Sequence, residues 1–186
     1  VNMNMAPLFA PVNITADING IPNSERAALV KILEAARVMD GLFLEQVWSG
    51  NPSLLLQLQN DRSAAGRAAL DFFLVNKGPW SRIEENKPFI SNVPDKPKGA
   101  AYYPSDSTRE EIASWIDGLS ESERRVATGF FTTIRRDENG ELQSIPYSLE
   151  YQGPLTLAAT YLREAAALTV EPTLRRYLET RADAFS

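Results

Sequence analysis

The chain has 186 residues and a formal net charge of −5 at pH 7, and it contains no cysteine and no histidine. These absences exclude disulfides, a cysteine nucleophile, a Ser-His-Asp triad and zinc sites built on thiolate or imidazole ligands. The negative charge argues against a nucleic-acid partner, because phosphate contacts need clustered lysine and arginine. No apolar run is long enough to span a membrane, and no signal peptide is visible. We therefore expect a soluble protein that does not bind membranes, with cytoplasm and periplasm as open alternatives.

The pattern of apolar residues predicts a mainly α fold with a small β-hairpin, an α+β class. An irregular lead-in over 1–22 carries three prolines, and a short edge strand is an option within 10–18. Apolar residues at spacings of three and four then indicate amphipathic helices in one helical domain over 23–186. Asn23 or Ser24 caps the first of them. The predicted helices cover 23–49, 52–60, 63–76, 107–118, 120–129, 154–168 and 172–185.

A long loop is predicted over 77–105, because seven prolines and glycines interrupt any regular element there. A structureless stretch of this length in a compact domain is usually functional or disordered. Its aromatic residues argue against disorder, since disordered segments contain few of them. The long loop is therefore the first place to look for a binding site.

Two Ser-x-x-Glu signatures after the loop predict capping boxes, in which a serine and a glutamate each satisfy a backbone N–H. The predicted pairs are Ser107 with Glu110 and Ser120 with Glu123. Farther on, β-branched and aromatic residues flank Asn139-Gly140, a dipeptide typical of tight hairpin turns. We predict an antiparallel hairpin over 130–147, turning at about 137–140, as the main β element.

The last predicted helix has no stop signal, whereas the earlier helices close on glycine or run into proline. Its apolar pattern still continues at Phe185, one residue before the end of the sequence. A frayed C-terminus explains this pattern as well as a chain that is a fragment of a longer protein. The pattern alone leaves both interpretations open.

Six segments stand out along the chain: "LVKILEAARVMDGLFLEQVWSGNP", "NKGPWSRIEENKPFI" (76–90), "GAAYYPSDSTREEI" (99–112), "TTIRRDENGELQSIPYS" (132–148), "YLREAAAL" (161–168) and "YLETRADAF" (177–185). Taken together, they resemble the N-terminal region of the dipeptidyl peptidase III family of zinc metallopeptidases. The match is to the shorter, bacterial-type members and to the related region that some plant proteins fuse to a Nudix domain. No single segment is a catalytic signature, but jointly they cover most of the chain.

The resemblance implies the helical lobe of a two-lobed enzyme that removes dipeptides from the N-termini of peptides. The family's zinc ligands and general base lie in an H-E-x-x-G-H helix and a following glutamate motif, C-terminal of the matched region. This chain contains neither motif. The resemblance thus implies no catalytic residue, metal ligand or cofactor in this chain, and zinc only in the full-length parent. The implied partners are the C-terminal catalytic lobe of the same protein and short peptides.

Two features depart from the family or from its plant relatives. Pro154 interrupts a stretch where the family pattern implies a continuous helix, and proline can shift the start of that helix. The Nudix label does not transfer either. A Nudix box needs a glycine followed by an R-E-x-x-E-E carboxylate cluster, and this sequence lacks such a run.

The long loop supplies the candidate substrate-binding residues of the implied peptide cleft. Their hydroxyl, amide, guanidinium and indole groups suit peptide recognition, and they are Tyr102, Tyr103, Asn86, Arg82 and Trp80. We predict that Trp80 and Phe89 point inward, because an ordered loop must bury enough apolar area to offset its chain entropy. The polar groups then face the other lobe. The alternative is that the aromatics only pack the core. Adjacent carboxylates such as Glu84 and Glu85 are usually solvated.

Two functions from different classes stand as hypotheses. The first is the non-catalytic N-terminal portion of a dipeptidyl peptidase III-like zinc exopeptidase, which contributes part of the peptide-binding cleft and is inactive alone. The second is a free-standing helical protein-interaction module without enzymatic activity, which has lost the catalytic lobe. A reading frame that continues into H-E-x-x-G-H supports the first. A natural stop codon after Ser186 supports the second.

Overall fold

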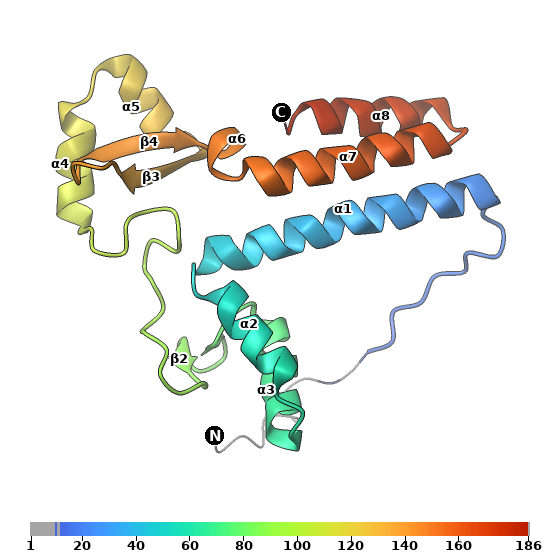
Figure 1. The fold of residues 1–186 in the computed structure, drawn as a ribbon, viewed down its shortest axis with the longest axis horizontal. Helices are drawn as coiled ribbons and strands as arrows, with labels where there is room; N and C mark the ends of the chain where they lie inside the picture. Colours follow the sequence, from blue (N-terminus) through green and yellow to red (C-terminus); the bar gives the residue numbers. More distant parts are fainter. Residues whose placement is uncertain (1–9, 11, 186) are drawn as a thin grey trace. The chain divides into compact units, whose positions relative to one another are not determined.

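The computed structural model describes residue 10 and residues 12–185, and it shows a mainly α fold with two small antiparallel strand pairs (Figure 1). The predicted fold class is confirmed. In chain order the elements are α1 (Asn23–Val47), α2 (Asn51–Asn60), α3 (Ala64–Asn76), β1 (Trp80–Ser81), β2 (Lys87–Pro88), α4 (Arg109–Gly118), α5 (Glu121–Ala127), β3 (Thr132–Arg136), β4 (Leu142–Pro146), α6 (Tyr147–Glu150), α7 (Gln152–Leu168) and α8 (Pro172–Asp183). Within the described part of the chain, none of the helices combines the length and the apolar character that crossing a membrane requires.

The described residues form two compact units. The first unit comprises Phe43–Thr128 and Ile134–Gln143, and the second comprises Asn13–Leu42, Gly129–Thr133 and the residues from Ser144 on. Helix α1 and the β3–β4 hairpin each contribute residues to both units. The long loop, with all the candidate binding residues, lies in the first unit.

In the second unit, α1, α7 and α8 pack around a core in which most side chains are alanine (Figure 1). The buried core residues are Ala28, Ala35, Ala158, Ala159, Leu162, Ala165, Ala166, Leu178 and Ala182. Small side chains at a contact shorten the distance between helix axes, so the three helices pack closely. An ion pair of 2.6 Å between Lys31 and Glu164 joins α1 to α7 at the rim of this core.

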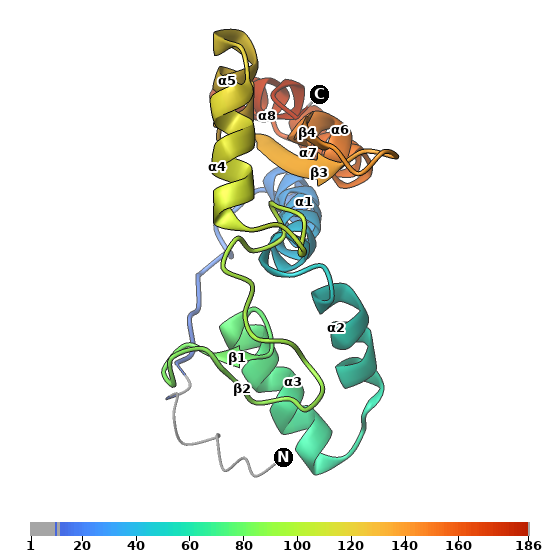
Figure 2. The same ribbon diagram turned by 90° about the vertical axis from the view of Figure 1, so that its left-hand side faces the viewer.

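In the first unit, α2 and α3 lie side by side (Figure 2) and share an apolar core in which most side chains are larger than alanine. Its buried residues are Leu44, Leu54, Leu58, Ala69 and Phe73. Ser63 caps α3, because its hydroxyl oxygen accepts the Gly66 N–H at 2.9 Å. Helix α3 ends at Asn76, and Lys77, with a left-handed φ of 57°, turns the chain into the long loop.

The predicted hairpin is confirmed: β3 and β4 pair with each other and turn at Asn139-Gly140. Gly140 has a φ of 84°, which L-residues with a side chain adopt only under strain. The Asp137 carboxylate fixes the turn by accepting the Asn139 N–H at 2.9 Å and the Glu141 N–H at 2.8 Å. These bonds hold the pKa of Asp137 below its ordinary value, and the bond from the Glu141 N–H has the largest effect.

Helix starts follow the predicted signals at two further places. Ser120 and Glu123 form a complete capping box at the start of α5, as predicted. Helix α7 begins at Gln152, so Pro154 lies in its first turn. A proline there removes no hydrogen bond, because the first N–H groups of a helix have no partner inside it.

One structure that the sequence left open does not form, and one local expectation is wrong. Residues 12–18 form no strand, because an extended segment becomes a strand only where a neighbour takes up its backbone hydrogen bonds. Thr108 rather than Ser107 caps α4, since the Thr108 hydroxyl accepts the Glu111 N–H at 3.1 Å. Ser107 instead donates its hydroxyl to the Pro104 carbonyl at 2.7 Å. Both hydroxyl residues have a glutamate three positions later, so the sequence pattern fits either register.

Candidate functional site

The long loop contains a short strand pair that the sequence did not indicate. Strands β1 and β2 pair antiparallel, with Trp80 opposite Pro88 and Ser81 opposite Lys87. Each strand has two residues, and an alternation of period two is not visible over such a length. The pair closes a turn over residues 82–86, which carries two of the five candidate residues.

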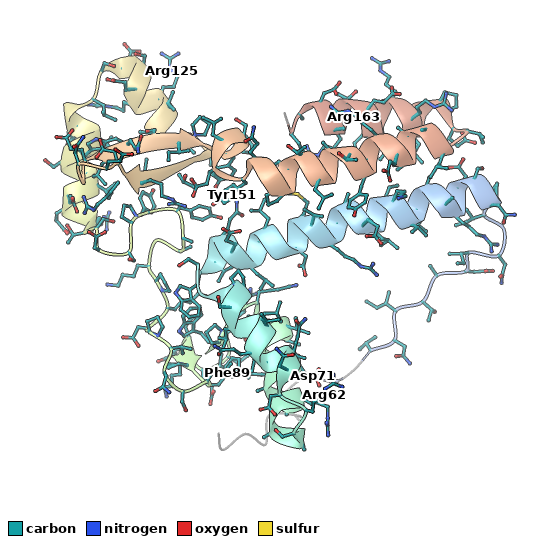
Figure 3. All side chains as sticks on the ribbon, in the orientation of Figure 1. Arg62, Asp71, Phe89, Arg125, Tyr151 and Arg163 are labelled. Atoms are coloured by element: carbon teal, nitrogen blue, oxygen red, sulfur yellow. The ribbon has the colours of Figure 1, made fainter. Side chains whose placement is uncertain are left out.

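The two large aromatics of the loop point inward, as predicted. Trp80 is only 2% exposed, and its indole N–H donates to the Pro94 carbonyl at 2.9 Å. Its ring packs edge-on against Trp48, with 5.4 Å between centroids. Phe89, labelled in Figure 3, packs edge-on against Phe72 of α3 at 4.6 Å. Trp80 therefore supports the loop from the inside and has almost no surface to offer a ligand.

Arg82 and Asn86 share the turn between β1 and β2, and both side chains are exposed. The backbone N–H of Arg82 donates to Oδ1 of Asn76, a buried residue at the end of α3, at 3.0 Å. Oδ1 of Asn86 accepts the Lys96 ammonium at 3.0 Å, and the Asn86 N–H donates to the Ser81 carbonyl at 2.9 Å. The turn thus presents a guanidinium and an amide from a backbone that is held at both ends.

Tyr102 and Tyr103 lie at a second anchored point of the same loop. The Tyr102 carbonyl accepts the Ile134 N–H of β3 at 2.8 Å, and the preceding residue, Ala101, donates its N–H to the Gln46 carbonyl of α1 at 2.9 Å. Tyr103 is 41% exposed. Its ring lies against Gly99, where an added Cβ would stand 2.8 Å from the ring's Cδ2 atom. The tyrosine pair therefore combines a fixed backbone with partly accessible rings.

Left-handed backbone is concentrated in this loop. All non-glycine residues with positive φ in the described part of the chain fall between positions 77 and 100: Lys77, Glu85, Asn86, Asn92 and Ala100. This conformation costs an L-residue about 1–2 kcal/mol. It persists only where surrounding contacts impose it, and such positions gather at functional sites. The loop has a defined shape that its hydrogen bonds and buried aromatics maintain.

The donor groups of this chain do not fit a zinc site. Histidine and cysteine are absent from the sequence. Among residue 10 and residues 12–185, no three carboxylates gather closely enough to hold a metal ion. Catalytic zinc takes three protein ligands that usually include histidine, and carboxylates alone suit harder cations. What the loop can do chemically is donate and accept hydrogen bonds.

A surface hollow of about 440 Å³ lies elsewhere in the first unit, between α4 and the hairpin turn. Trp115 and Leu142 line its apolar side, and none of the five candidates lines it. Arg136 also lines it, but its guanidinium is bonded to Asp106 at 2.9 Å, to Glu111 and to the Gly140 carbonyl. The bonds to the two carboxylates raise the pKa of Arg136, and the bond to Glu111 has the largest effect. We place the candidate site in the loop, because Arg136, the arginine that lines the hollow, is already bonded to two carboxylates and a carbonyl.

Sequence reasoning missed three polar residues that shape the loop. Asn51 and Ser81 are fully buried, and the Asn51 amide donates to the Leu44 carbonyl at 2.9 Å. Asn51 Oδ1 and Ser81 Oγ are buried without a hydrogen-bond partner among the described residues. The third is Arg135, whose guanidinium reaches the Ala101 carbonyl. For the contact of Arg135 with Ala101, the one signal in the sequence was an arginine inside a predicted strand.

Solved structures show where such a fold occurs. The chain superimposes on dipeptidyl-peptidase III from Corallococcus sp. strain EGB with a TM-score of 0.93, at 52% identity, over 97% of this chain and 34% of that one. It superimposes on DPP III from Caldithrix abyssi with a TM-score of 0.88, at 39% identity, over 95% of this chain and 33% of that one. No protein-family model matches the chain.

The chain is thus similar, in fold and in sequence, to part of a class of peptidases. The resemblance to the dipeptidyl peptidase III family that the sequence indicates is confirmed by these two neighbours. A plant protein, Nudix hydrolase 3 of Arabidopsis thaliana, is also similar, at 31% identity over 95% of this chain and 29% of that protein. The chain spans about a third of the length of the solved relatives and less of the plant relative.

Proposed function

We propose that this chain is the non-catalytic N-terminal portion of a dipeptidyl peptidase III-like zinc exopeptidase. The observation that carries the proposal is 52% identity over 97% of this chain with only 34% of a dipeptidyl-peptidase III. In this proposal, the zinc and the general base belong to a C-terminal catalytic lobe of the same protein. Zinc bound there would activate water for attack on the peptide bond.

The loop then forms part of the wall of the peptide-binding cleft. Arg82 and Asn86 offer a guanidinium and an amide from one turn, and Tyr102 and Tyr103 offer hydroxyls from the second anchored point. A peptide main chain needs both donors and acceptors, which these groups supply. Trp80 contributes by holding the turn in place. Such a wall acts by orienting the peptide, not by transferring protons.

A free-standing helical interaction module is the second candidate, and one observation is compatible with it. Phe130 and Phe131, directly before β3, are 93% and 76% exposed. Large adjacent aromatics in solvent mark a surface that packs against something else. In the first proposal that partner is the remainder of the same polypeptide, whereas in the second it is another protein.

The test compares the isolated chain with the complete gene product. The nucleotide sequence beyond Ser186 is determined first, and both proteins are assayed for release of dipeptides from a chromogenic dipeptidyl substrate with and without a zinc chelator. The proposal expects chelator-sensitive release by the complete product and none by the isolated chain. A stop codon directly after Ser186, or a complete product without chelator-sensitive release, contradicts it.

A further inference from the structure

Three hydrogen bonds join the backbone around the tyrosine pair to α1 and β3. Ala101 donates its N–H to the Gln46 carbonyl at 2.9 Å, and the Tyr102 carbonyl accepts the Ile134 N–H at 2.8 Å. The Ala101 carbonyl accepts Nη2 of Arg135 at 3.0 Å. The first two bonds join backbone groups, so no substitution removes them selectively. Arg135 is the side chain among these contacts that a substitution can remove.

The guanidinium of Arg135 spans two carbonyl groups. Its Nη1 donates to the Ile134 carbonyl in β3 at 2.9 Å, while Nη2 reaches Ala101 in the loop. A planar, permanently charged fork holds two acceptors in a fixed relation, which the single ammonium of lysine does not. Hydrogen bonds from a charged donor are also stronger than neutral ones. Arg135 therefore fastens the loop segment to the strand beside it.

The backbone at Ala100 and Ala101 has a conformation that needs hydrogen bonds to maintain it. Ala100 has a left-handed φ of 50°, which is unfavourable for alanine. It sits directly before Ala101, whose N–H and carbonyl are both bonded. Release of either bond would let Ala100 relax to ordinary backbone and would move Tyr102 and Tyr103 with it.

Arg136, the next residue along the strand, makes different contacts. Arg136 binds Asp106 at 2.9 Å and Glu111, which fixes the start of α4. Successive residues of a strand point to opposite faces, and the two arginines accordingly bond different segments. The contribution of Arg135 can thus be removed without breaking the ion pairs of Arg136.

We propose that Arg135 is a positioning residue that fixes the Tyr102–Tyr103 segment in the shape that peptide binding requires. The effect on peptide binding rests on the proposed function. The effect on the loop does not, because it follows from contacts within this chain.

The test uses Arg135→Met, which removes the charge, and Arg135→Lys, which keeps it without the fork. Arg125→Met, at an exposed arginine of α5, is the matched control. Amide hydrogen exchange in the 186-residue chain should accelerate about tenfold at Ala101 and Ile134 in Arg135→Met, and less in Arg135→Lys. Exchange in α7 and in the control should match the wild type. The lysine variant keeps the test informative if the methionine variant fails to fold.

The second measurement is the steady-state kinetics of peptide cleavage by the complete gene product. Arg135→Met should raise KM for peptides more than it lowers kcat, Arg135→Lys should restore part of the loss, and Arg125→Met should change neither constant. Unchanged exchange at Ala101 and Ile134 overturns the positioning role. Faster exchange with wild-type KM shows a contact that is merely structural and also overturns the proposal. If the complete product releases no dipeptides, the proposed function fails, and exchange alone then supports or overturns the fastening of the loop.

Discussion

The carboxylate of Glu25 accepts a hydrogen bond from the Thr169 hydroxyl at 2.6 Å, across 144 positions of sequence. It also accepts the Val170 N–H at 2.8 Å. These bonds join the first turn of α1 to the connection between α7 and α8, at one end of the alanine-rich core. The bond from Thr169 first, and then that from Val170, lowers the pKa of Glu25.

The Glu25 contact makes the stability of the second unit depend on pH. A carboxyl whose folded pKa is depressed contributes stability above its unfolded pKa of about 4.3 and loses it as the pH falls through the folded pKa. Glu25→Gln should therefore unfold at lower urea concentration than the wild type at pH 7. The difference should close at acid pH, below the ordinary glutamate range. Glu45→Gln, which changes an exposed glutamate on the same helix, is the control. If the urea midpoints of Glu25→Gln and the wild type differ by the same amount at every pH, the account is contradicted.

Removing the Trp80 ring should destabilise the first unit, because the ring fills a buried site and its N–H holds Pro94. Trp80→Ala should lower the free energy of unfolding by about 3–5 kcal/mol. Trp80→Phe keeps most of the apolar area and should lose less. Urea denaturation measures both, with the half-buried Trp115→Ala as a comparison expected to lose less than Trp80→Ala. A loss below about 1 kcal/mol in Trp80→Ala would mean that the ring does not support the loop.

Replacing each of two glycines by alanine should change the stability of the chain in opposite directions. Gly140→Ala should destabilise the chain by about 1 kcal/mol or more, because its φ of 84° is strained for alanine. Gly41→Ala lies inside α1, where an added Cβ meets nothing within 4 Å. It should stabilise the chain by about 0.5–1 kcal/mol through helix propensity. Thermal unfolding of the two variants checks this, and shifts of the same sign would contradict either the turn geometry or the helix.

The sequence predicted those elements whose signals are local. Ser120 with Glu123, and Asn139-Gly140, each define a cap or a turn within four residues, and both are confirmed. The strand pair of Trp80–Ser81 with Lys87–Pro88 was missed because two residues carry no periodicity. The bond from Arg135 to Ala101 joins positions 34 apart. No local pattern encodes such a contact, so the shape of the candidate site could not be derived in advance.

The role of the loop in a peptide cleft is tested most directly by steady-state kinetics on the complete gene product. Asn86→Ala and Tyr102→Phe each remove one polar group that we assign to peptide binding. Asn60→Ala and Tyr177→Phe, at exposed positions on α2 and α8, are the matched controls. The loss of one hydrogen bond should raise KM for peptides by about 2–10-fold, with kcat and bound zinc retained and the controls unchanged. Wild-type KM in both Asn86→Ala and Tyr102→Phe would contradict the account and would leave the loop as structural packing.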